Sequence, residues 1–243
     1  MRHLLSDVFE AVEEDDDMQL FLDSAKTAEI ERALEMWDVD GVTTNPRHIQ
    51  ESGKTFRRAI TEIADLFAGT DKPISVEVDP HLTDWTKIVE QGLELSQLSP
   101  NFVIKVGISE SGAKAIRELT AQGVRVNATL VFSVAQAWQA ARAGAAYISP
   151  FLGWKEQFGD DAHTLIADVR SMLDNFGYPA RIIAAAVRNA RQMGDAAVAG
   201  AHCLTTGLST CLESFQNPYT QMGEQLFQDA WDQTPQEPSA PVG

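Results

Sequence analysis

Short apolar segments alternate with amphipathic helical patterns along almost the whole chain, and this alternation restricts the possible folds more than any other feature. The segments that predict strands are 20–23, 41–45, 74–78, 102–106, 126–131, 147–150, 181–185 and 202–206. Helical patterns separate them over 26–37, 53–68, 83–97, 110–122, 133–143, 161–176 and 189–199, and two terminal helices are predicted over 209–215 and 219–231. Strands that alternate with helices pair in parallel through right-handed crossovers, so eight such units predict a single (β/α)8 TIM barrel.

The main alternative is an open, doubly wound sheet, but the glycine-rich phosphate loop that often marks such a fold does not follow the first strand. A chain of 243 residues with 44% hydrophobic content suits one barrel domain, which we expect over residues 19–232. Residues 1–18 form a short acidic extension that contains the run Glu13 to Asp17, and their apolar residues recur at helical spacing. Residues 233–243 carry three prolines among polar residues, and we expect a disordered tail.

The charge of the chain argues against several classes of partner. A formal net charge of −16 would repel nucleic acids and anionic membrane surfaces, and an anionic substrate would need a locally positive pocket. Two cysteines are too few for a disulfide scaffold or a thiolate metal site. Neither an apolar run of membrane-spanning length nor a secretory signal is evident, so we expect a cytoplasmic protein.

Lys105 lies inside the strongly apolar strand segment 102–106. An ammonium that leaves water loses several kcal/mol of solvation unless it is paired or loses its proton. One interpretation is an edge strand from which Lys105 reaches solvent. The other is a buried lysine whose apolar surroundings favour the neutral amine, which can attack a carbonyl and form a Schiff base.

Polar residues cluster where the predicted strands end, which is the edge of a TIM barrel that carries catalytic side chains. Each has an ordinary explanation when taken alone, such as a helix cap at Asp23, an Asn-Pro turn at Asn45 or a plain strand threonine at Thr129. Together they are hard to explain as structure, because each unpaired buried polar group costs roughly 1 to 3 kcal/mol. The set is Asp23, Thr43, Asn45, Glu77, Lys105, Asn127, Thr129, Ser149 and Arg188.

The strand motifs, in order and with their spacing, resemble those of the transaldolase family, in particular its small single-barrel branch. The similarity covers about residues 19–232. The motifs are Leu22-Asp23, Gly41-Val42-Thr43-Thr44-Asn45-Pro46, Ser75-Val76-Glu77-Val78, Ile104-Lys105-Val106, Asn127-Ala128-Thr129-Leu130-Val131-Phe132-Ser133 and Ala145 to Gly153.

The resemblance implies a metal-free class I enzyme without a cofactor that transfers a dihydroxyacetone unit from a ketose to an aldehyde through a lysine Schiff base. Lys105 matches the nucleophile, Asp23 the general acid/base, and Glu77 with Thr129 the pair that holds a water used in imine formation. This division of labour is chemically sensible, because a protonated imine is the electron sink that cleavage beside a ketone requires. Groups that hold the hydroxyls of the donor match Thr43, Asn45, Asn127 and Ser133.

Three positions depart from the family pattern near the expected active site. Gly107 replaces a proline, Trp154 with Lys155 next to it replaces a phosphate-binding arginine, and Ala186 replaces a serine two residues before Arg188. Each lost hydrogen bond to a charged group is worth roughly 1.5 to 3 kcal/mol. We therefore expect the donor to carry a different end group from the usual phosphate, with Trp154 as an apolar or stacking wall. The alternative is that Lys155 and Arg188 together replace the missing arginine and hold a phosphate in an altered pose.

Two other functions remain as alternatives. A related aldolase releases free dihydroxyacetone, but it is associated with glutamine and tyrosine where this chain has Glu77 and Phe132 beside the expected substrate. A sugar-binding homologue that has lost turnover is the other alternative. The resemblance also implies a homo-oligomer whose C-terminal helix packs on a neighbouring copy, through Phe215, Met222, Leu226, Phe227 and Trp231.

Overall fold

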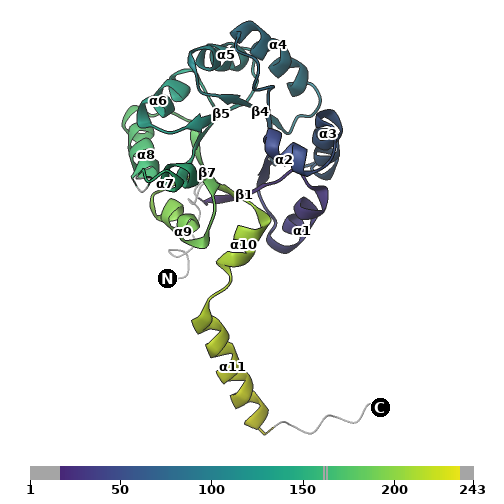
Figure 1. Ribbon diagram of the computed structural model, residues 1–243, viewed down its shortest axis with the longest axis vertical. Helices are drawn as coiled ribbons and strands as arrows, with labels where there is room; N and C mark the ends of the chain where they lie inside the picture. The colour runs from purple at the N-terminus through teal and green to yellow at the C-terminus, as the bar shows by residue number, and fades with distance from the viewer. Residues whose placement is uncertain (1–16, 161, 163, 236–243) are drawn as a thin grey trace, which may run out of the picture.

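Eight parallel strands close into a barrel in their order along the chain, and the first strand pairs with the last. The computed structural model describes residues 17–160, 162 and 164–235. Figure 1 looks along the barrel, with the strands in the centre and the helices in an outer ring. The strands are β1 (Gln19–Asp23), β2 (Gly41–Thr43), β3 (Ile74–Glu77), β4 (Phe102–Gly107), β5 (Val126–Val131), β6 (Tyr147–Pro150), β7 (Arg181–Val187) and β8 (Cys203–Thr206).

The outer helices bury one apolar face against the strands, as their periodicity predicts. In α5, for example, Ala115, Ile116 and Leu119 are buried. The helices of the ring are α1 (Thr27–Trp37), α3 (Phe56–Leu66), α4 (Trp85–Ser96), α5 (Glu110–Ala121), α6 (Val134–Arg142), α8 (Leu165–Phe176) and α9 (Ala190–Val198), followed by α10 (Leu208–Ser214) and α11 (Pro218–Gln233).

The predicted (β/α)8 barrel is confirmed, and the open-sheet alternative is wrong because hydrogen bonds between β1 and β8 close the sheet. The edge-strand interpretation of Lys105 is also wrong. β4 is paired on both sides, with β3 and β5, and Lys105 is only 5% exposed. A closed barrel has no edge from which this lysine can reach solvent.

Two short helices were not predicted, α2 (Pro46–Glu51) and α7 (Leu152–Gln157). Each has only six residues, so neither shows a full period of apolar positions. α2 begins at a proline in its first turn, directly after Asn45, whose side chain accepts a hydrogen bond from the backbone of His48. Both helices follow barrel strands at their C-terminal ends, and they form part of the rim of the barrel.

Two strands contain bulges near the same rim. The β5–β6 register shifts between Ala128 and Val131, and the β7–β8 register shifts between Ala184 and Val187. Within these bulges Leu130 has φ 59° and Ala186 has φ 55°, both in the left-handed region that side chains disfavour. The carbonyl of Ala186 lies so close to Gly153 in α7 that a Cβ at Gly153 would stand 2.3 Å from it. Glycine at this position therefore permits α7 to pack directly on β7.

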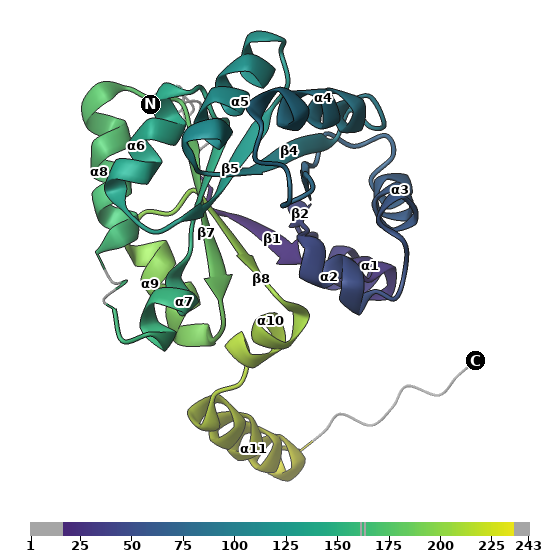
Figure 2. The ribbon, with the colours of Figure 1, turned by 45° about the horizontal axis from the view of Figure 1, so that its top comes forward.

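The last helix, α11, extends away from the barrel (Figures 1 and 2). None of its residues is buried, although large apolar side chains recur along it at spacings of three and four residues. These are Tyr219, Met222, Leu226, Phe227 and Trp231. The helix runs two residues past its predicted end, and most of the acidic N-terminal extension and of the predicted tail lie outside the described residues. No helix in the described part of the chain combines the length and the apolar character needed to cross a membrane.

Candidate active site

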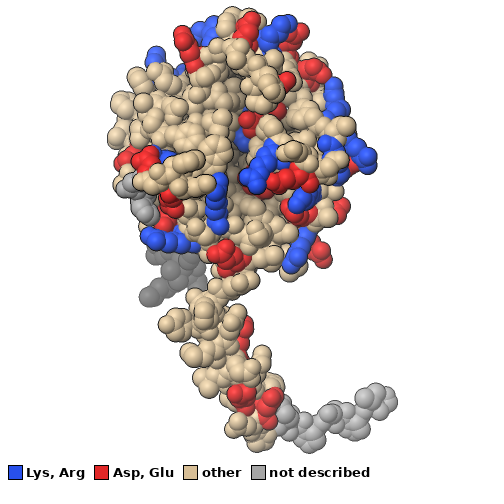
Figure 3. Space-filling model, in the orientation of Figure 1, with Lys and Arg blue, Asp and Glu red and all other residues tan. Residues whose placement is uncertain are grey.

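A cavity of about 630 Å³ opens at the C-terminal ends of the barrel strands. The space-filling view in Figure 3 shows this hollow near the centre of the barrel face, with basic side chains beside it. A cavity of this size is in the range that holds a small-molecule ligand. Most of the polar side chains singled out in the sequence line it, namely Asp23, Thr43, Asn45, Glu77, Lys105, Thr129, Ser149 and Arg188.

Lys105 projects into the barrel from β4, because side chains alternate along a strand and its neighbours Ile104 and Val106 pack in the outer core. Its Nζ donates a hydrogen bond of 2.9 Å to the carbonyl of Thr44 and lies 3.3 Å from Glu77 Oε2. Glu77 is the register partner of Lys105 on β3. The surroundings of the amine are thus less apolar than its strand suggests, because a backbone carbonyl and a carboxylate both lie close to it.

Asp23 lies at the end of β1 and is held by two donors. Thr43 Oγ1 donates to Asp23 Oδ1 at 2.7 Å, and His48 Nδ1 lies 3.2 Å from the same oxygen. Since Thr43 uses its proton here, Thr205 Oγ1 acts as the donor in its 2.6 Å contact with Thr43. Burial raises the pKa of Asp23, but the hydrogen bond from His48, the charges of His48 and Lys105 and the hydrogen bond from Thr43 outweigh it. The net result is a pKa below the ordinary value, which keeps Asp23 ionised.

Polar groups also fill the barrel beneath the cavity. Asn127 is fully buried, donates to Ser75 Oγ at 3.1 Å and accepts from Ser149 Oγ at 2.8 Å. Thr129 Oγ1 is buried and has no hydrogen-bond partner among the described residues. A buried hydroxyl without a partner is costly, and this one faces the cavity that Lys105 also lines. Thr129 is therefore placed to bind a small polar molecule or a substrate hydroxyl.

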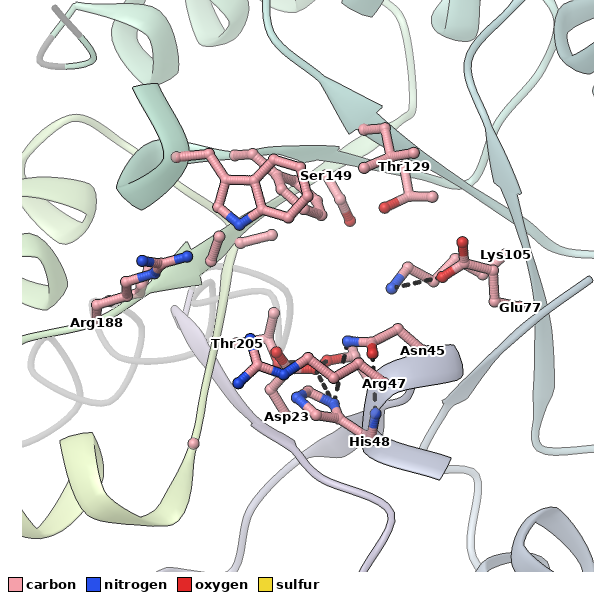
Figure 4. Close-up of a pocket in the computed structure, with 18 of the residues that line it drawn as sticks. Asp23, Asn45, Arg47, His48, Glu77, Lys105, Thr129, Ser149, Arg188 and Thr205 are labelled. Carbon is pink, nitrogen blue, oxygen red and sulfur yellow. Dashed lines mark hydrogen bonds and ion pairs between the residues drawn. The ribbon is translucent and has the colours of Figure 1, made fainter. Parts of the chain in front are cut away.

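Figure 4 shows how the labelled side chains are arranged around the cavity. Lys105 and Glu77 lie together on one side, Asp23, Asn45 and His48 gather below them, and Arg188 lies on the opposite side. The two catalytic candidates of opposite charge, Lys105 and Asp23, thus face a common space from different strands.

The Arg188 side of the cavity combines a guanidinium with an aromatic cluster. Arg188 Nη1 donates to Gln157 Oε1 at 2.7 Å, and Trp154, which is 42% exposed, lines the same wall. Phe132 packs behind this wall, with ring centroids 6.1 Å from Trp154 and 5.6 Å from Phe151. Phe132 itself is not among the lining residues, so it supports the tryptophan rather than meeting the cavity.

Besides Phe132, three more sequence candidates do not line the cavity. Asn127 lies beneath the cavity, as described above. Ser133 caps helix α6 by accepting a hydrogen bond from the backbone of Gln136, and it does not line the cavity. Lys155, considered as a substitute for the missing arginine, forms an ion pair with Asp160 and is also absent from the lining.

Sequence reasoning missed Arg47 and His48, which both line the cavity from α2. Figure 4 shows Arg47 extending over the cavity, and its Nε is held 2.8 Å from Glu51 Oε1. The signal that could have found them is the pair Asn45-Pro46. An asparagine followed by proline is a helix start as well as a turn, because proline is tolerated in the first turn and asparagine is a good cap.

Comparison with known proteins agrees with the strand motifs. The family model for transaldolase/fructose-6-phosphate aldolase matches residues 20–238. A 6-deoxy-6-sulfo-D-fructose transaldolase of Priestia aryabhattai is 49% identical over 226 residues, which cover 93% of this chain and 99% of that protein. A probable transaldolase 2 of Listeria monocytogenes is 41% identical over 215 residues, covering 88% of this chain and 96% of that protein. A probable transaldolase of a Caulobacter species is 41% identical over 219 residues, covering 90% and 99%. The chain therefore belongs to the transaldolase/fructose-6-phosphate aldolase family.

Proposed function

We propose that this transaldolase-type transferase uses a Schiff base on Lys105 to move a dihydroxyacetone unit from a ketose with a sulfonate at C6 to an aldehyde acceptor. The observation that carries the chemistry is the buried amine of Lys105, 3.3 Å from Glu77 and in one cavity with Asp23. The donor is suggested by the 49% identical relative named for 6-deoxy-6-sulfo-D-fructose, and by the altered residues at the Arg188 end of the cavity.

The reaction begins when Glu77 takes a proton from Lys105 and the neutral amine attacks the C2 carbonyl of the ketose. The carbinolamine loses water to give a protonated imine, and Thr129 and Glu77 hold and protonate the leaving oxygen. Asp23 then removes the proton of the C4 hydroxyl. The C3–C4 bond breaks, its electron pair enters the imine as an enamine, and the C4–C6 fragment leaves as an aldehyde.

Transfer runs the same steps backwards with a second aldehyde. The enamine carbon attacks the carbonyl of the acceptor, and Asp23 returns its proton to the new oxygen. Water then hydrolyses the imine and frees Lys105. Thr43 and Asn45, which line the cavity near Asp23, hold the hydroxyls of the donor. Asn127 acts indirectly, by orienting Ser149 from below.

The end of the donor that does not react is held by Arg188 and Arg47, the two arginines that line the cavity in the described part of the chain, with Trp154 as its apolar wall. A phosphate ester carries a charge of about −1.5 to −2 near neutral pH, and it is best served by several cations and donors. A sulfonate carries a single negative charge. Because Trp154 and Ala186 stand where the family pattern has an arginine and a serine, the pocket suits the singly charged group better.

We also propose that the protein works in the cytoplasm as a homo-oligomer in which α11 packs on a neighbouring copy. The support is the row of apolar side chains on α11, of which Phe227 is 73% exposed and Trp231 67% exposed in the single chain. Burial of such a row on another copy would remove it from water.

The deciding experiment is borohydride trapping followed by a donor screen. The protein is incubated with 6-deoxy-6-sulfofructose, fructose 6-phosphate or fructose, reduced, and weighed by intact-protein mass spectrometry. The proposal expects an adduct of one dihydroxyacetone unit or one ketose, most abundant with the sulfonated donor. Turnover with an added aldehyde acceptor then separates a transferase from an aldolase, since only an aldolase releases stoichiometric free dihydroxyacetone. If none of the donors leaves an adduct, the chain does not perform this chemistry.

A further inference from the structure

We infer that His48 is a positioning residue for Asp23, which holds the Oδ1 atom of the carboxylate so that its Oδ2 atom exchanges the proton with the substrate. This inference rests on the proposed function, because it assigns a role within the acid/base step of that reaction. His48 lies on α2, the helix that sequence patterns did not predict.

The imidazole of His48 is fixed in place from two directions. Its own backbone N–H donates to Asn45 Oδ1 at 3.1 Å, so the residue belongs to the capped first turn of α2. The ring Nδ1 then lies 3.2 Å from Asp23 Oδ1 and 3.1 Å from Asn45 Nδ2. With 18% of its side chain exposed, the ring has little freedom to turn elsewhere.

The contacts of the carboxylate assign its two oxygens different tasks. Thr43 and His48 both reach Oδ1, and no hydrogen bond or ion pair from the described residues engages Oδ2. With two donors on one oxygen, the lone pairs of the other stay available on the side of the cavity. An acid/base group benefits from such fixation, because a misplacement of about 1 Å can cost about 10²-fold in rate.

The role of Nδ1 as donor or acceptor follows from its neighbours. An ionised Asp23 needs a donor at Nδ1, so it favours a ring that carries a proton on that nitrogen. When Asp23 holds the proton of the substrate, its carboxyl group no longer requires a donor at Nδ1. Asn45 Nδ2 is then in place to donate to an unprotonated Nδ1. The hydrogen bond from His48 is therefore strongest when Asp23 is charged, and it favours the form of Asp23 that accepts a proton.

His48 is not isolated from other charges or from solvent. It also lines a second cavity, of about 370 Å³, which Asp23 and Glu51 line as well. The charged groups that border the two cavities near it are Asp23 from β1, Lys26 and Glu29 from the start of α1, Arg47 and Glu51 from α2, Glu77 from β3 and Lys105 from β4. Lys26 and Glu29 neutralise one another at 3.1 Å, as do Arg47 and Glu51 at 2.8 Å, so Asp23 is the dominant charge at Nδ1.

The test compares His48→Phe, which removes the donor, with His48→Asn, whose amide nitrogen can take the place of Nδ1. In His48→Phe we expect normal borohydride trapping of the imine, a fall of at least about 10-fold in transfer rate, and an acidic limb of kcat/KM that moves to higher pH. His48→Asn should recover most of the rate near neutral pH and bring the acidic limb back toward that of the parent. A residue with a purely structural role would change folding without moving the limb.

A matched control is available on the surface. His81 Nδ1 lies 2.7 Å from Asp79 Oδ1 in an exposed pair of the same kind, so His81→Phe should leave both trapping and the pH profile unchanged. If His48→Phe does not fold, His48→Ala replaces it in the comparison. A Phe or Ala variant that folds and keeps the rate and the pH profile of the parent would overturn the inference. A parent protein that gives no trapped adduct would instead contradict the proposed function.

Discussion

Glu77 Oε2 lies 3.3 Å from Lys105 Nζ, and the two residues are direct register partners on β3 and β4. Their side chains are only 14% and 6% exposed, so both charges have largely left water. A buried pair of this kind is tolerated because each partner offsets the desolvation of the other. In the proposed reaction, Glu77 is the base that removes the proton of this amine before it attacks a carbonyl.

Lys105→Met should abolish the borohydride adduct, because no other lysine lines the main cavity in the described part of the chain. The fold should be retained, with a lower melting temperature, since breaking a buried pair typically costs about 3–5 kcal/mol. Adding Glu77→Gln should recover part of the lost stability by removing the unpaired charge. Intact mass and thermal denaturation measure the two effects.

Lys114 provides the control for this prediction. It is a lysine on α5 that pairs with Glu118 at 2.5 Å, outside the cavity. Lys114→Met should be trapped at the yield of the parent protein. A Lys105→Met variant with a normal adduct would remove Lys105 from the mechanism.

Asp23→Ala should form the imine and accumulate it, because the proton of the C4 hydroxyl then has no acceptor. Transfer should fall by about 10² to 10⁴, the usual contribution of general acid/base catalysis. A coupled assay measures the transfer rate, and borohydride trapping measures the fraction of the protein that carries the imine. Asp79→Ala, which changes an exposed carboxylate that pairs with His81 and does not line the main cavity, should leave both values near those of the parent. Turnover within a few fold of the parent would show that Asp23 is not the acid/base.

The preference of the cavity for one donor over another should change when Trp154 and Ala186 are replaced by the arginine and serine of the family pattern. Trp154→Arg with Ala186→Ser adds a cation and a hydroxyl at the Arg188 end, so we expect kcat/KM for fructose 6-phosphate to rise relative to that for the sulfonated donor. Phe158→Arg is the control for added charge, because Phe158 is 81% exposed and lies outside the cavity. Fast use of fructose 6-phosphate by the parent, unimproved by the double change, would mean that Arg47 and Arg188 already bind phosphate well.

Most of the fold could be predicted from the sequence, because each strand of a parallel barrel is buried on both faces and each helix on one. All eight strands, the ring helices and α10 and α11 follow from these patterns. The two rim helices α2 and α7 could not be found in this way, since six residues contain less than two helical turns.

The candidate site could also be predicted only in part. Residues on strands, such as Lys105 and Glu77, could be placed because strand ends converge in a barrel. Their mutual contact depends on register, which the alternation of strands and helices does not specify. Arg47 and His48 were missed with the helix that carries them. Ser133 was expected at the substrate, but its hydroxyl is used as a helix cap, a competition that the sequence alone does not decide.

Substitutions on α11 should test the proposed oligomer. Leu226→Glu with Phe227→Glu places two charges on an exposed apolar row, so the assembly should dissociate and its mass by light scattering should fall to that of a smaller species. Gln225→Glu, on the same helix, changes a residue that bonds to Asp229 and should leave the mass unaltered. A parent protein that is already monomeric would contradict the proposal.

His202 should make the protein less stable as the pH falls. Burial lowers the pKa of His202, and the charges of Arg170 and Arg181 lower it further, while its Nδ1 accepts a hydrogen bond of 3.0 Å from the backbone of Ile182. Above about pH 6.5, the ordinary pKa of histidine, folded and unfolded states are both neutral here. Below it the unfolded state gains a proton first, so stability declines until the pH reaches the lower pKa of the folded state.

The measurement is urea denaturation at pH 7.5 and pH 5.5 for the parent and for His202→Asn. Asparagine keeps an acceptor for the backbone of Ile182 but does not titrate. The parent should lose more stability than the variant over this interval. An equal loss in both proteins would assign the pH dependence to other groups.

The left-handed backbone at Leu130 and Ala186 restricts which residues related sequences can have at these two positions. Each occupies the left-handed region inside a strand, next to Thr129 and near Arg188, at a cost of about 1–2 kcal/mol for an ordinary side chain. Branching at Cβ would raise that cost, so valine, isoleucine and threonine should be absent from both alignment columns in any homologue that keeps these bulges, although the surrounding strands favour them. The absence of these three residue types from the two columns would thus identify, from sequence alone, which relatives share this shape of the catalytic rim.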